Sequence, residues 1–339
     1  MNIKDNISLK QYNSFGIDVK SRYFSSFASA EQLTELITGS SLAAKYPLLI
    51  LGGGSNILFT KDFDGLLLKN EIKGIELVKE DEHFYYVKAG AGENWHRFVI
   101  YCIENNYAGI ENLSLIPGNV GASPMQNIGA YGVEIKDVFY ELEAYHLKEN
   151  RLQVFELDDC NFGYRESVFK SKYKSRFVII SVTYKLRKQP VFNISYGIIE
   201  QELAKMQVTE LSLKAISEAV IRIRSSKLPD PAQIGNAGSF FKNPLIPQTQ
   251  FDQLEKSFPA ITGFPAEKEK IKMAAGWLIE QCGWKGYRKG DAGCYEKQAL
   301  VLVNYGQATG KDILALSESI IETVYAKFQV RLEREVNIV

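Results

Sequence analysis

The sequence has few of the side chains that bind metals or form disulfide bonds. Its 339 residues include three histidines and four cysteines. No two cysteines form a Cys-x-x-Cys pair, and the histidines have no metal-ligand spacing relative to them. These residues are His83, His96, His146, Cys102, Cys160, Cys282 and Cys294. We therefore predict no metal site and no disulfide, and we interpret His96, beside Trp95 at the start of a helix, as a structural histidine.

An excess of charge of one sign and a long apolar run are also missing. Forty basic residues balance forty acidic ones, so the net charge does not favour nucleic acid or an anionic membrane as a partner. Apolar runs such as Phe177–Val182 are far shorter than a bilayer span, and the first eight residues lack the blocks of a signal peptide. With 45% hydrophobic and 24% charged residues, the chain is predicted to be a globular, cytoplasmic monomer of two or three domains.

The sequence instead has two loops rich in glycine and asparagine. The first, Leu51–Leu58, reads Leu-Gly-Gly-Gly-Ser-Asn-Ile-Leu, and the second, Ile116–Gly132, has two prolines and almost no charge. Glycine lets backbone N–H groups point toward one anion, so each loop suits a pyrophosphate, and two such loops favour a large, extended cofactor. Neither loop matches a dinucleotide fingerprint or a P-loop, and the first is also compatible with a tight turn between strands.

Hydrophobic periodicity predicts an α+β chain. Helices are expected over residues 31–45, 95–105, 212–226, 266–282 and 310–328, and strands over 47–51, 65–69, 85–92, 138–147, 177–186 and 330–339. Gly283 is a predicted helix C-cap. The segment Leu228-Pro-Asp-Pro231 cannot continue a helix and marks a domain boundary. In the last strand Glu333 and Glu335 are expected on one face.

Four positions are candidates for chemistry: Ser239, Arg165, Lys227 and the terminal glutamates. Ser239 lies in Ala-Gly-Ser-Phe-Phe, which is not the Gly-x-Ser-x-Gly of a hydrolase, and no histidine is tied to it by pattern. A serine can still donate a proton to a carbanion or enol that its neighbours stabilise. Serine beside glycine is also common in turns, and that alternative stays open on the residues alone.

Six segments, in this order, resemble one family. They are Gly52-Gly-Gly-Ser-Asn56, Pro117–Gly132, Gly163-Tyr-Arg-Glu-Ser167, Lys227-Leu-Pro-Asp-Pro231, Gly235-Asn-Ala-Gly-Ser-Phe-Phe-Lys-Asn-Pro244 and Leu332-Glu-Arg-Glu-Val336. The pattern resembles the UDP-N-acetylenolpyruvoylglucosamine reductases, also called UDP-N-acetylmuramate dehydrogenases, of peptidoglycan precursor synthesis. The likeness covers nearly the whole chain. It implies non-covalent FAD, NADPH as reductant, and reduction of UDP-N-acetylglucosamine enolpyruvate to UDP-N-acetylmuramate.

The resemblance also implies catalytic roles. Ser239 matches the serine that protonates the substrate α-carbon after flavin N5 delivers hydride to the β-carbon. Arg165 and Glu335 match the pair that stabilises the enolate-like intermediate. A guanidinium suits the growing negative charge, whereas an ionised carboxylate would repel it, so Glu335 is expected to be protonated or hydrogen-bonded at that step. The family pattern, not the spacing, selects Glu335 over Glu333.

Binding residues are implied in the same way. Four residues match positions near the uridine diphosphate: Tyr131, Lys227, Asn243 and Gln298. On the residues alone, Lys227 is also compatible with a solvated helix end and Gln298 with a surface residue that has no binding role. Tyr196 matches a tyrosine on a substrate-covering loop found in one subgroup of the family. The positions implied to bind FAD are Gly52, Gly53, Gly54, Ser55, Asn56, Pro117, Gly118, Gly121, Ala122, Ser123, Gln126, Asn127, Gly129, Ala130 and Arg224.

The implied fold is α+β throughout. A two-part FAD-binding module, like that of p-cresol methylhydroxylase and vanillyl-alcohol oxidase, precedes a C-terminal α+β substrate-binding domain. The expected domains are FAD-binding subdomain 1 over residues 1–69, subdomain 2 over 70–225 with closing strand 330–339, and the substrate-binding domain over 226–329.

The chain departs from the family pattern at a few positions. Asn119 and Ala122 stand where other small residues are frequent, and Asn337 stands where arginine is frequent, so residue 337 is given no role. Two other functions compete: an FAD-dependent oxidase of the same fold acting on an alcohol or sugar, and a non-catalytic nucleotide-binding module. Ser239 and Lys227 favour the reductase, and no histidine suggests covalent flavin attachment.

Overall fold

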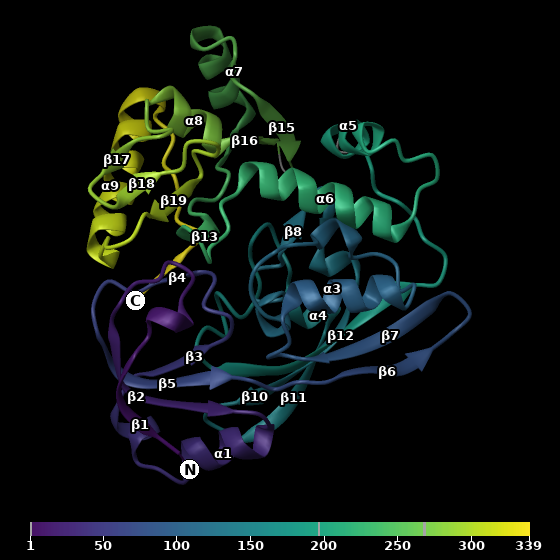
Figure 1. Cartoon of the computed structure of the whole chain (residues 1–339), viewed down its shortest axis with the longest axis vertical. Helices are drawn as coiled ribbons and strands as arrows, with labels where there is room; N and C mark the ends of the chain where they lie inside the picture. The colour runs from purple at the N-terminus through teal and green to yellow at the C-terminus, as the bar shows by residue number, and fades with distance from the viewer. Residues whose placement is uncertain (1, 196, 267–268) are drawn as a thin grey trace. The chain divides into compact units, whose positions relative to one another are not determined.

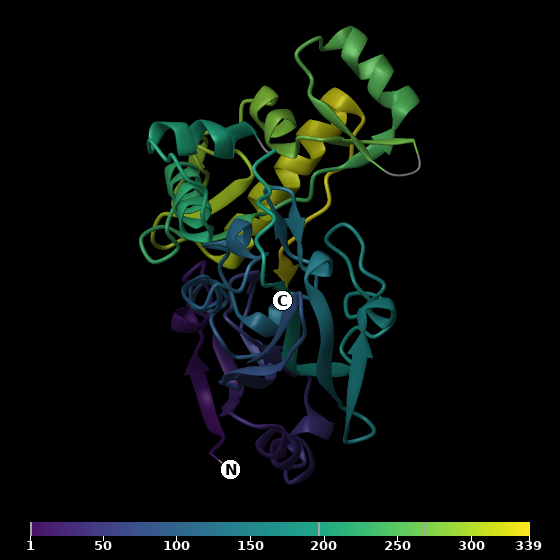
Figure 2. The ribbon, with the colours of Figure 1, turned by 90° about the vertical axis from the view of Figure 1, so that its right-hand side faces the viewer.

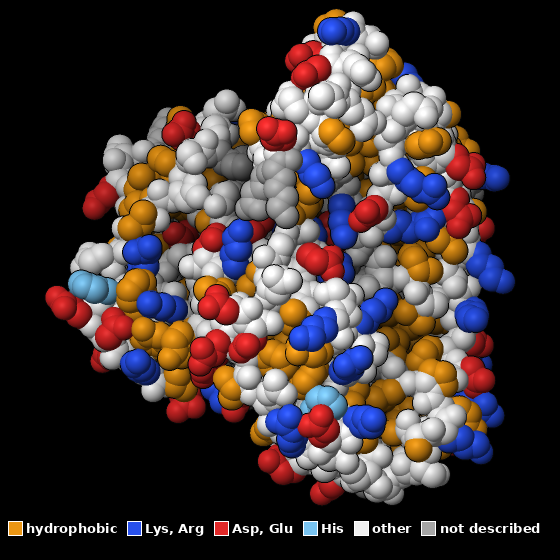
Figure 3. Space-filling model, turned by 180° about the vertical axis from the view of Figure 1, so that it is seen from behind, with side chains coloured by type: hydrophobic (Ala, Val, Ile, Leu, Met, Phe, Trp, Pro, Cys, Tyr) orange, Lys and Arg blue, Asp and Glu red, His pale blue; other side chains and the backbone are white. Residues whose placement is uncertain are grey.

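The computed structural model describes residues 2–195, 197–266 and 269–339. Contacts between residues divide the chain into two compact units. The first unit comprises residues 1–7, 21–53 and 64–226, and the second comprises 8–20, 54–63 and 227–339. Among the described residues, no helix has the length and apolar character needed to cross a membrane. Acidic and basic side chains are interspersed on the face drawn in Figure 3.

The first unit contains a four-stranded sheet near the N-terminus. Its strand order is β1-β2-β5-β3, with β1 Lys4–Ser8, β2 Lys20–Phe27, β3 Leu48–Leu51 and β5 Phe63–Asn70. Strands β3 and β5 are parallel and joined by the first glycine loop. Helices α1 (Ala30–Thr38) and α2 (Leu42–Lys45) precede β3. Ser29 caps α1, because its side chain accepts a hydrogen bond from the Gln32 N–H.

A five-stranded antiparallel sheet forms the centre of the first unit (Figure 1). Its order is β11-β10-β12-β7-β6, with β6 Ile75–Glu80, β7 Phe84–Gly90, β10 Phe139–His146, β11 Arg151–Glu156 and β12 Phe177–Arg187. Helix α3 (Trp95–Glu104) covers one face, where Trp95 and Phe98 pack with Val182 and Tyr184. Residues of the opposite face, such as Ile180, pack against Leu66 and α1.

The segment between α3 and β10, which includes the second loop, is short of regular structure. It contains the 3-10 turns η2 (Glu111–Leu113), η3 (Val120–Ala122) and η4 (Ile135–Asp137) and the hairpin of β8 (Gly129–Ala130) and β9 (Val133–Glu134). Helix α4 (Leu157–Cys160) follows β11, and α5 (Gly197–Lys205) and α6 (Leu213–Lys227) pack together through Leu203 and Ile216.

The second unit has its own hydrophobic core, in which Phe240, Leu278 and Phe328 are buried. Its sheets are β13-β19-β18-β17, β14-β16-β15 and the parallel pair β20-β4. The helix α7 lies against the hairpin of β15 and β16 (Figure 2). Element bounds are β4 Ile57–Leu58, η1 Lys10–Tyr12, β13 Gly235–Ser239, β14 Leu245–Pro247, α7 Gln248–Ser257, β15 Gly263–Ala266, β16 Lys270–Met273, α8 Ala275–Gln281, β17 Arg288–Lys289, β18 Ala292–Cys294, β19 Val301–Asn304, α9 Gly310–Phe328 and β20 Asn337–Ile338.

Most of the predicted elements are present, and three differ. The helix expected over 31–45 is interrupted at Gly39 between α1 and α2. The helix expected from residue 266 is wrong: β15 and β16 occupy most of 263–273, and the helix begins only at Ala275. Lys270–Met273 alternates exposed and buried side chains and pairs with β14, so strand pairing overrides the helical spacing. Gly283 follows α8 with a φ of +81°, as its predicted capping role requires.

The C-terminal segment is the third difference. We expected residues 330–339 to form a closing strand of the domain 70–225, but the strand is only Asn337–Ile338, it pairs with β4, and both strands lie in the second unit. Of the apolar side chains expected on one face, Val330, Leu332 and Val336 are buried in the core of that unit, but Ile338 is exposed. The three-domain division otherwise stays a prediction.

Candidate functional site

The predicted site residues fall into both units. The first unit holds Gly52, Gly53, Pro117, Gly118, Gly121, Ala122, Ser123, Gln126, Asn127, Gly129, Ala130, Tyr131, Arg165 and Arg224. The second holds Gly54, Ser55, Asn56, Lys227, Ser239, Asn243, Gln298 and Glu335. Tyr196 lies outside the described residues. The predicted catalytic trio is therefore divided, with Arg165 in the first unit and Ser239 and Glu335 in the second.

The two glycine loops meet at Gly53. A Cβ at Gly53 would lie 2.9 Å from Asn119 Oδ1 and 3.0 Å from the Gly118 Cα, so a side chain there would displace the second loop. The second loop is itself held close to the strand-to-helix connection before α3: Val120 N–H donates to Glu93 O at 2.8 Å and Gly121 N–H to Ala91 O at 2.9 Å. A Cβ at Gly121 would lie 2.6 Å from the Ala91 Cβ. Glycine is thus required by close backbone approach, the condition for a loop that surrounds a phosphate with N–H groups.

Two polar residues of the second loop support the loop itself. The Ser123 side chain is 2.7 Å from the Tyr184 hydroxyl, and both are buried. Asn127 is also buried, and its amide donates to Glu134 Oε2 at 2.9 Å and to Gly163 O at 3.1 Å. These side-chain hydrogen bonds position the loop backbone. We therefore predict that Ser123 and Asn127 contact a cofactor through their backbone groups and not through their side chains.

Tyr131 and Gly132 form the two-residue turn between β8 and β9. Both have positive φ, +49° and +82°, the conformation of a type I′ hairpin turn, which twists with the strands it joins. A tyrosine in the left-handed region is strained. The buried Asn112 amide donates to Tyr131 O at 3.0 Å and holds the turn in place.

Positive charge gathers beside this turn. Arg165 donates to Gly129 O at 2.7 Å, and Tyr131 interacts with Arg224 on α6. The Nε of Arg224 is buried and has no hydrogen-bond partner among the residues that the structure describes. Burial lowers the pKa of Arg224, and the positive charge of Arg165 acts in the same direction. A guanidinium still stays protonated at neutral pH, and a buried donor without a partner favours an anionic ligand.

His96 is structural, as expected. Its Nδ1 accepts a hydrogen bond from the Leu115 N–H at 3.0 Å, so it holds the start of the second loop. Burial and the positive charge of Arg224 lower the pKa of His96, which keeps the ring neutral for this bond.

Ser239 is presented by a distortion of β13. The register between β13 and β19 shifts between Asn236 and Ser239, and Gly238 has a φ of +68°. The buried Asn236 shapes this bulge, since its Oδ1 accepts from Gly238 N–H at 2.9 Å and its amide donates to Ile234 O at 2.8 Å and to Pro229 O at 3.1 Å. A bulge turns a side chain out of the normal alternation. Ser239 is exposed as a result, while Asn236 and Ala237 are buried.

Glu335 lies beside the Ser239 segment. Its backbone N–H donates to Phe240 O at 2.8 Å, and Phe241 and Arg334 form an isolated β-bridge. Glu333 is in a different environment: its carboxylate is 3.4 Å from Lys242 Nζ and 75% of its side chain is exposed. The structure therefore distinguishes two glutamates that the sequence pattern places on one face.

Asn243 and Gln298 lie at the start of α8. Asn243 Oδ1 accepts from the Ala275 N–H at 3.0 Å and caps the helix. Gln298 Oε1 lies 3.0 Å from the position of a Cβ at Gly276. The two amides predicted to bind substrate are thus brought together. Lys227, the last residue of α6, is exposed.

The segment Asn13–Gly16 was not among the predicted site residues. Ser14 N–H donates to Gly54 O at 3.0 Å, Ser14 O accepts from Asn236 N–H at 3.0 Å, and a Cβ at Gly54 would lie 1.9 Å from Tyr12 O. This segment therefore connects the end of the first loop to the Ser239 bulge within the second unit. Its Asn-Ser-Phe-Gly sequence indicates a turn, but nothing local shows what it contacts.

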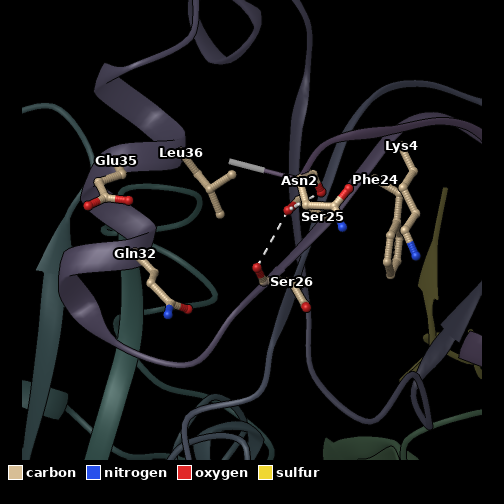
Figure 4. A pocket seen from close by; sticks show the side chains of 8 residues that line it. All are labelled: Asn2, Lys4, Phe24, Ser25, Ser26, Gln32, Glu35 and Leu36. Carbon is tan, nitrogen blue, oxygen red and sulfur yellow. Dashed lines mark hydrogen bonds between the residues drawn. The ribbon is translucent and has the colours of Figure 1, made fainter.

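One pocket of the first unit contains none of the predicted residues. It has a volume of about 330 Å³ and lies between α1 and strands β1 and β2, with Lys4, Gln32 and Glu35 among its lining residues (Figure 4). Among the described residues, no cluster of three or more histidine, cysteine, aspartate and glutamate side chains is arranged to hold a metal ion, and all four cysteines are free thiols.

Comparison with known proteins gives two domain matches. Residues 25–148 match the FAD binding domain family, and residues 230–339 match the family described as UDP-N-acetylenolpyruvoylglucosamine reductase, C-terminal domain. Together with the mixed sheets and helices, these matches confirm the predicted fold class, an FAD-binding α+β module followed by a C-terminal α+β domain.

Full-length relatives are similar throughout. The UDP-N-acetylenolpyruvoylglucosamine reductase of Flavobacterium johnsoniae is 50% identical over 340 residues and that of Amoebophilus asiaticus 51% over 339 residues, with 100% of both chains covered in each case. The crystal structure of UDP-N-acetylenolpyruvylglucosamine reductase from Thermus caldophilus matches the fold with a TM-score of 0.69, at 22% identity, over 100% of this chain and 99% of that one.

Proposed function

We propose a specific reaction for this chain, which belongs to the family of UDP-N-acetylenolpyruvoylglucosamine reductases and is thus a flavin-dependent oxidoreductase of peptidoglycan precursor synthesis. The proposed reaction is the NADPH-dependent reduction of UDP-N-acetylglucosamine enolpyruvate to UDP-N-acetylmuramate. The observation that carries the proposal is the pairing of the Ser239 segment with the Glu335 segment, through the Glu335 N–H and Phe240 O at 2.8 Å.

The residues present fit FAD. The backbone approach at Gly53 leaves space only for hydrogen at that Cα, and the Nε of Arg224 is a buried donor with no hydrogen-bond partner among the described residues. We assign Gly52, Gly53, Gly118, Gly121 and Arg224 to the anionic part of the cofactor. FAD held by these residues would supply hydride-transfer chemistry between NADPH and the β-carbon of the enolpyruvyl group.

The chain's own side chains then complete the reduction. Ser239, exposed on the β13 bulge, donates a proton to the α-carbon, and this proton transfer is expected to accelerate the step about 10²- to 10⁴-fold. Arg165 binds the substrate carboxylate, whose negative charge grows as hydride arrives. Glu335, protonated or hydrogen-bonded at this step, stabilises the same charge without repelling it.

The remaining predicted residues bind the nucleotide. Asn243 and Gln298, together at the start of α8, supply amides for the uracil or the phosphates. Lys227 contributes a charge for the pyrophosphate, and Tyr131 a hydroxyl. Tyr196 is assigned to cover the substrate, on the family pattern alone.

The test is a turnover experiment with product analysis. Purified protein is given NADPH and UDP-N-acetylglucosamine enolpyruvate, and we expect one product molecule, two hydrogen atoms heavier than the substrate, per NADPH consumed. UDP-N-acetylglucosamine, which lacks the enolpyruvyl group, serves as the control and should not stimulate NADPH consumption. NADPH oxidation that depends only on oxygen would contradict the proposal and favour an oxidase.

A further inference from the structure

Asn56 of the first loop forms hydrogen bonds with Glu335 and with Asn337. Its amide Nδ2 donates to Glu335 O at 3.2 Å. Its own carbonyl accepts two hydrogen bonds from Asn337, one from the backbone N–H at 3.1 Å and one from the side-chain Nδ2 at 2.9 Å. One residue of the loop therefore contacts the chain on both sides of Val336.

These contacts fix the Glu335 backbone at both of its polar groups. Its N–H is bonded to Phe240 O and its carbonyl to Asn56. Val336, the next residue, is 4% exposed and packs in the core of the second unit. Asn56 is therefore one of the groups that hold the Glu335 backbone.

Asn337 contacts Asn56 through two hydrogen bonds, one from its backbone and one from its side chain. Strand β20 pairs with β4 over only two residues, Asn337 with Ile57 and Ile338 with Leu58. Asn56 O already accepts the backbone N–H of Asn337 in the pairing of β20 with β4, and the Asn337 side chain donates a second hydrogen bond to the same oxygen. Asn337 is exposed, so this contact is not explained by a need to bury the side chain.

We propose that Asn337 is a positioning residue for Glu335 and acts through Asn56. Loss of the Asn337 amide removes one of the two hydrogen bonds described for Asn56 O and loosens the Asn56 contact to the Glu335 carbonyl. The step affected is the one in which Glu335 takes part, reduction of the substrate, and not the reduction of flavin by NADPH. The inference rests on the proposed function.

The chain offers a matched control in the same pair of strands. Thr60 Oγ1 donates to Val339 O at 2.9 Å, so it is also a side-chain contact between the residues after β4 and the C-terminal segment. It lies at the far end of the ladder from Glu335. Thr60→Val removes this hydrogen bond with little change in size.

The experiment measures the two half-reactions of the FAD-loaded enzyme separately, in anaerobic stopped flow. For Asn337→Ala we expect reoxidation by UDP-N-acetylglucosamine enolpyruvate to slow about three- to tenfold, the range of one lost hydrogen bond, with flavin reduction by NADPH unchanged. Asn337→Asp, which keeps the size but cannot donate, should show at least the same loss. Thr60→Val should match the wild type in both half-reactions.

Three results would overturn the inference: wild-type reoxidation in Asn337→Ala, equal slowing in Asn337→Ala and Thr60→Val, or equal slowing of both half-reactions. Melting temperatures of the three variants are measured as well. If the slowing came only from a less stable C-terminal segment, Thr60→Val would show the same loss of stability and the same slowing. Failure of the wild type to be reoxidised by substrate is a different outcome, because it contradicts the proposed function.

Discussion

Gly53 and Gly121 of the first unit and Gly238 of the second unit serve opposite structural purposes. At Gly53 and Gly121 there is no space for a Cβ, because backbone of the neighbouring segments lies within about 3 Å. At Gly238 a Cβ would meet no atom within 4 Å, and glycine is needed only for its φ of +68°. The first arrangement allows close approach of backbone segments, and the second exposes the Ser239 side chain. Close backbone approach thus requires glycine in the loops, whereas the backbone conformation of Gly238 requires it in the bulge.

The largest expected effect tests the Ser239 bulge. Ser239→Ala should slow substrate-dependent reoxidation of the flavin about 10²- to 10⁴-fold, as loss of a general acid does. Reduction of the flavin by NADPH should stay at the wild-type rate, because Ser239 takes no part in it. Stopped-flow absorbance of the flavin measures both rates. Wild-type reoxidation in this variant would remove Ser239 from the mechanism.

The second prediction separates the two terminal glutamates. Glu335→Ala should slow reoxidation by substrate roughly 10²- to 10³-fold, through loss of stabilisation of the developing charge. Glu333→Ala is the matched control: it removes an exposed ion pair with Lys242, which contributes little, and its rate should change less than about twofold. Equal effects of the two substitutions would mean that the family pattern selects the wrong carboxylate.

The third prediction concerns binding in the first unit. Gly53→Ala should weaken FAD affinity roughly ten- to a hundredfold, because the new Cβ must displace the Gly118 backbone. Gly197→Ala is the control, since a Cβ there meets no atom within 4 Å. Fluorescence quenching on titration of the flavin-free protein with FAD gives both dissociation constants. Unchanged affinity in Gly53→Ala would show that the loop does not need this close approach.

The smallest expected effect is a pH dependence of stability in the first unit. Because the folded-state pKa of His96 is lowered from 6.5, its neutral form contributes stability that is present above pH 6.5 and is lost as the pH falls through the lowered pKa. His96→Gln should therefore reduce the fall in melting temperature between neutral and mildly acidic pH. His83→Gln, at a side chain that is 73% exposed, should not. Identical pH profiles for wild type and His96→Gln would contradict this role.

Much of the fold, but not all of it, could be predicted from the sequence. Helices α3, α6 and α9 and strands β3, β5, β7, β10 and β12 follow from local periodicity. In residues 266–282 the spacing of Ile271, Leu278 and Ile279 predicts a helix, but Lys270–Met273 pairs with both β14 and β15 and is a strand.

Within the site, sequence order identified the segments but not the direction of their side chains. The exposure of Ser239 depends on three hydrogen bonds of Asn236, to partners that include Pro229 O. The inward direction of Ser123 depends on Tyr184, which is 61 residues away in sequence. Such contacts are set by tertiary packing, which a single sequence does not display.

The most direct measurement of the central claim is a single anaerobic titration. The flavin-loaded protein is first bleached with one equivalent of NADPH, and UDP-N-acetylglucosamine enolpyruvate is then added without oxygen. We predict that the flavin absorbance returns in proportion to the enolpyruvate added, with formation of UDP-N-acetylmuramate. A flavin that stays bleached until oxygen is admitted would contradict the claim that this chain reduces the enolpyruvyl ether.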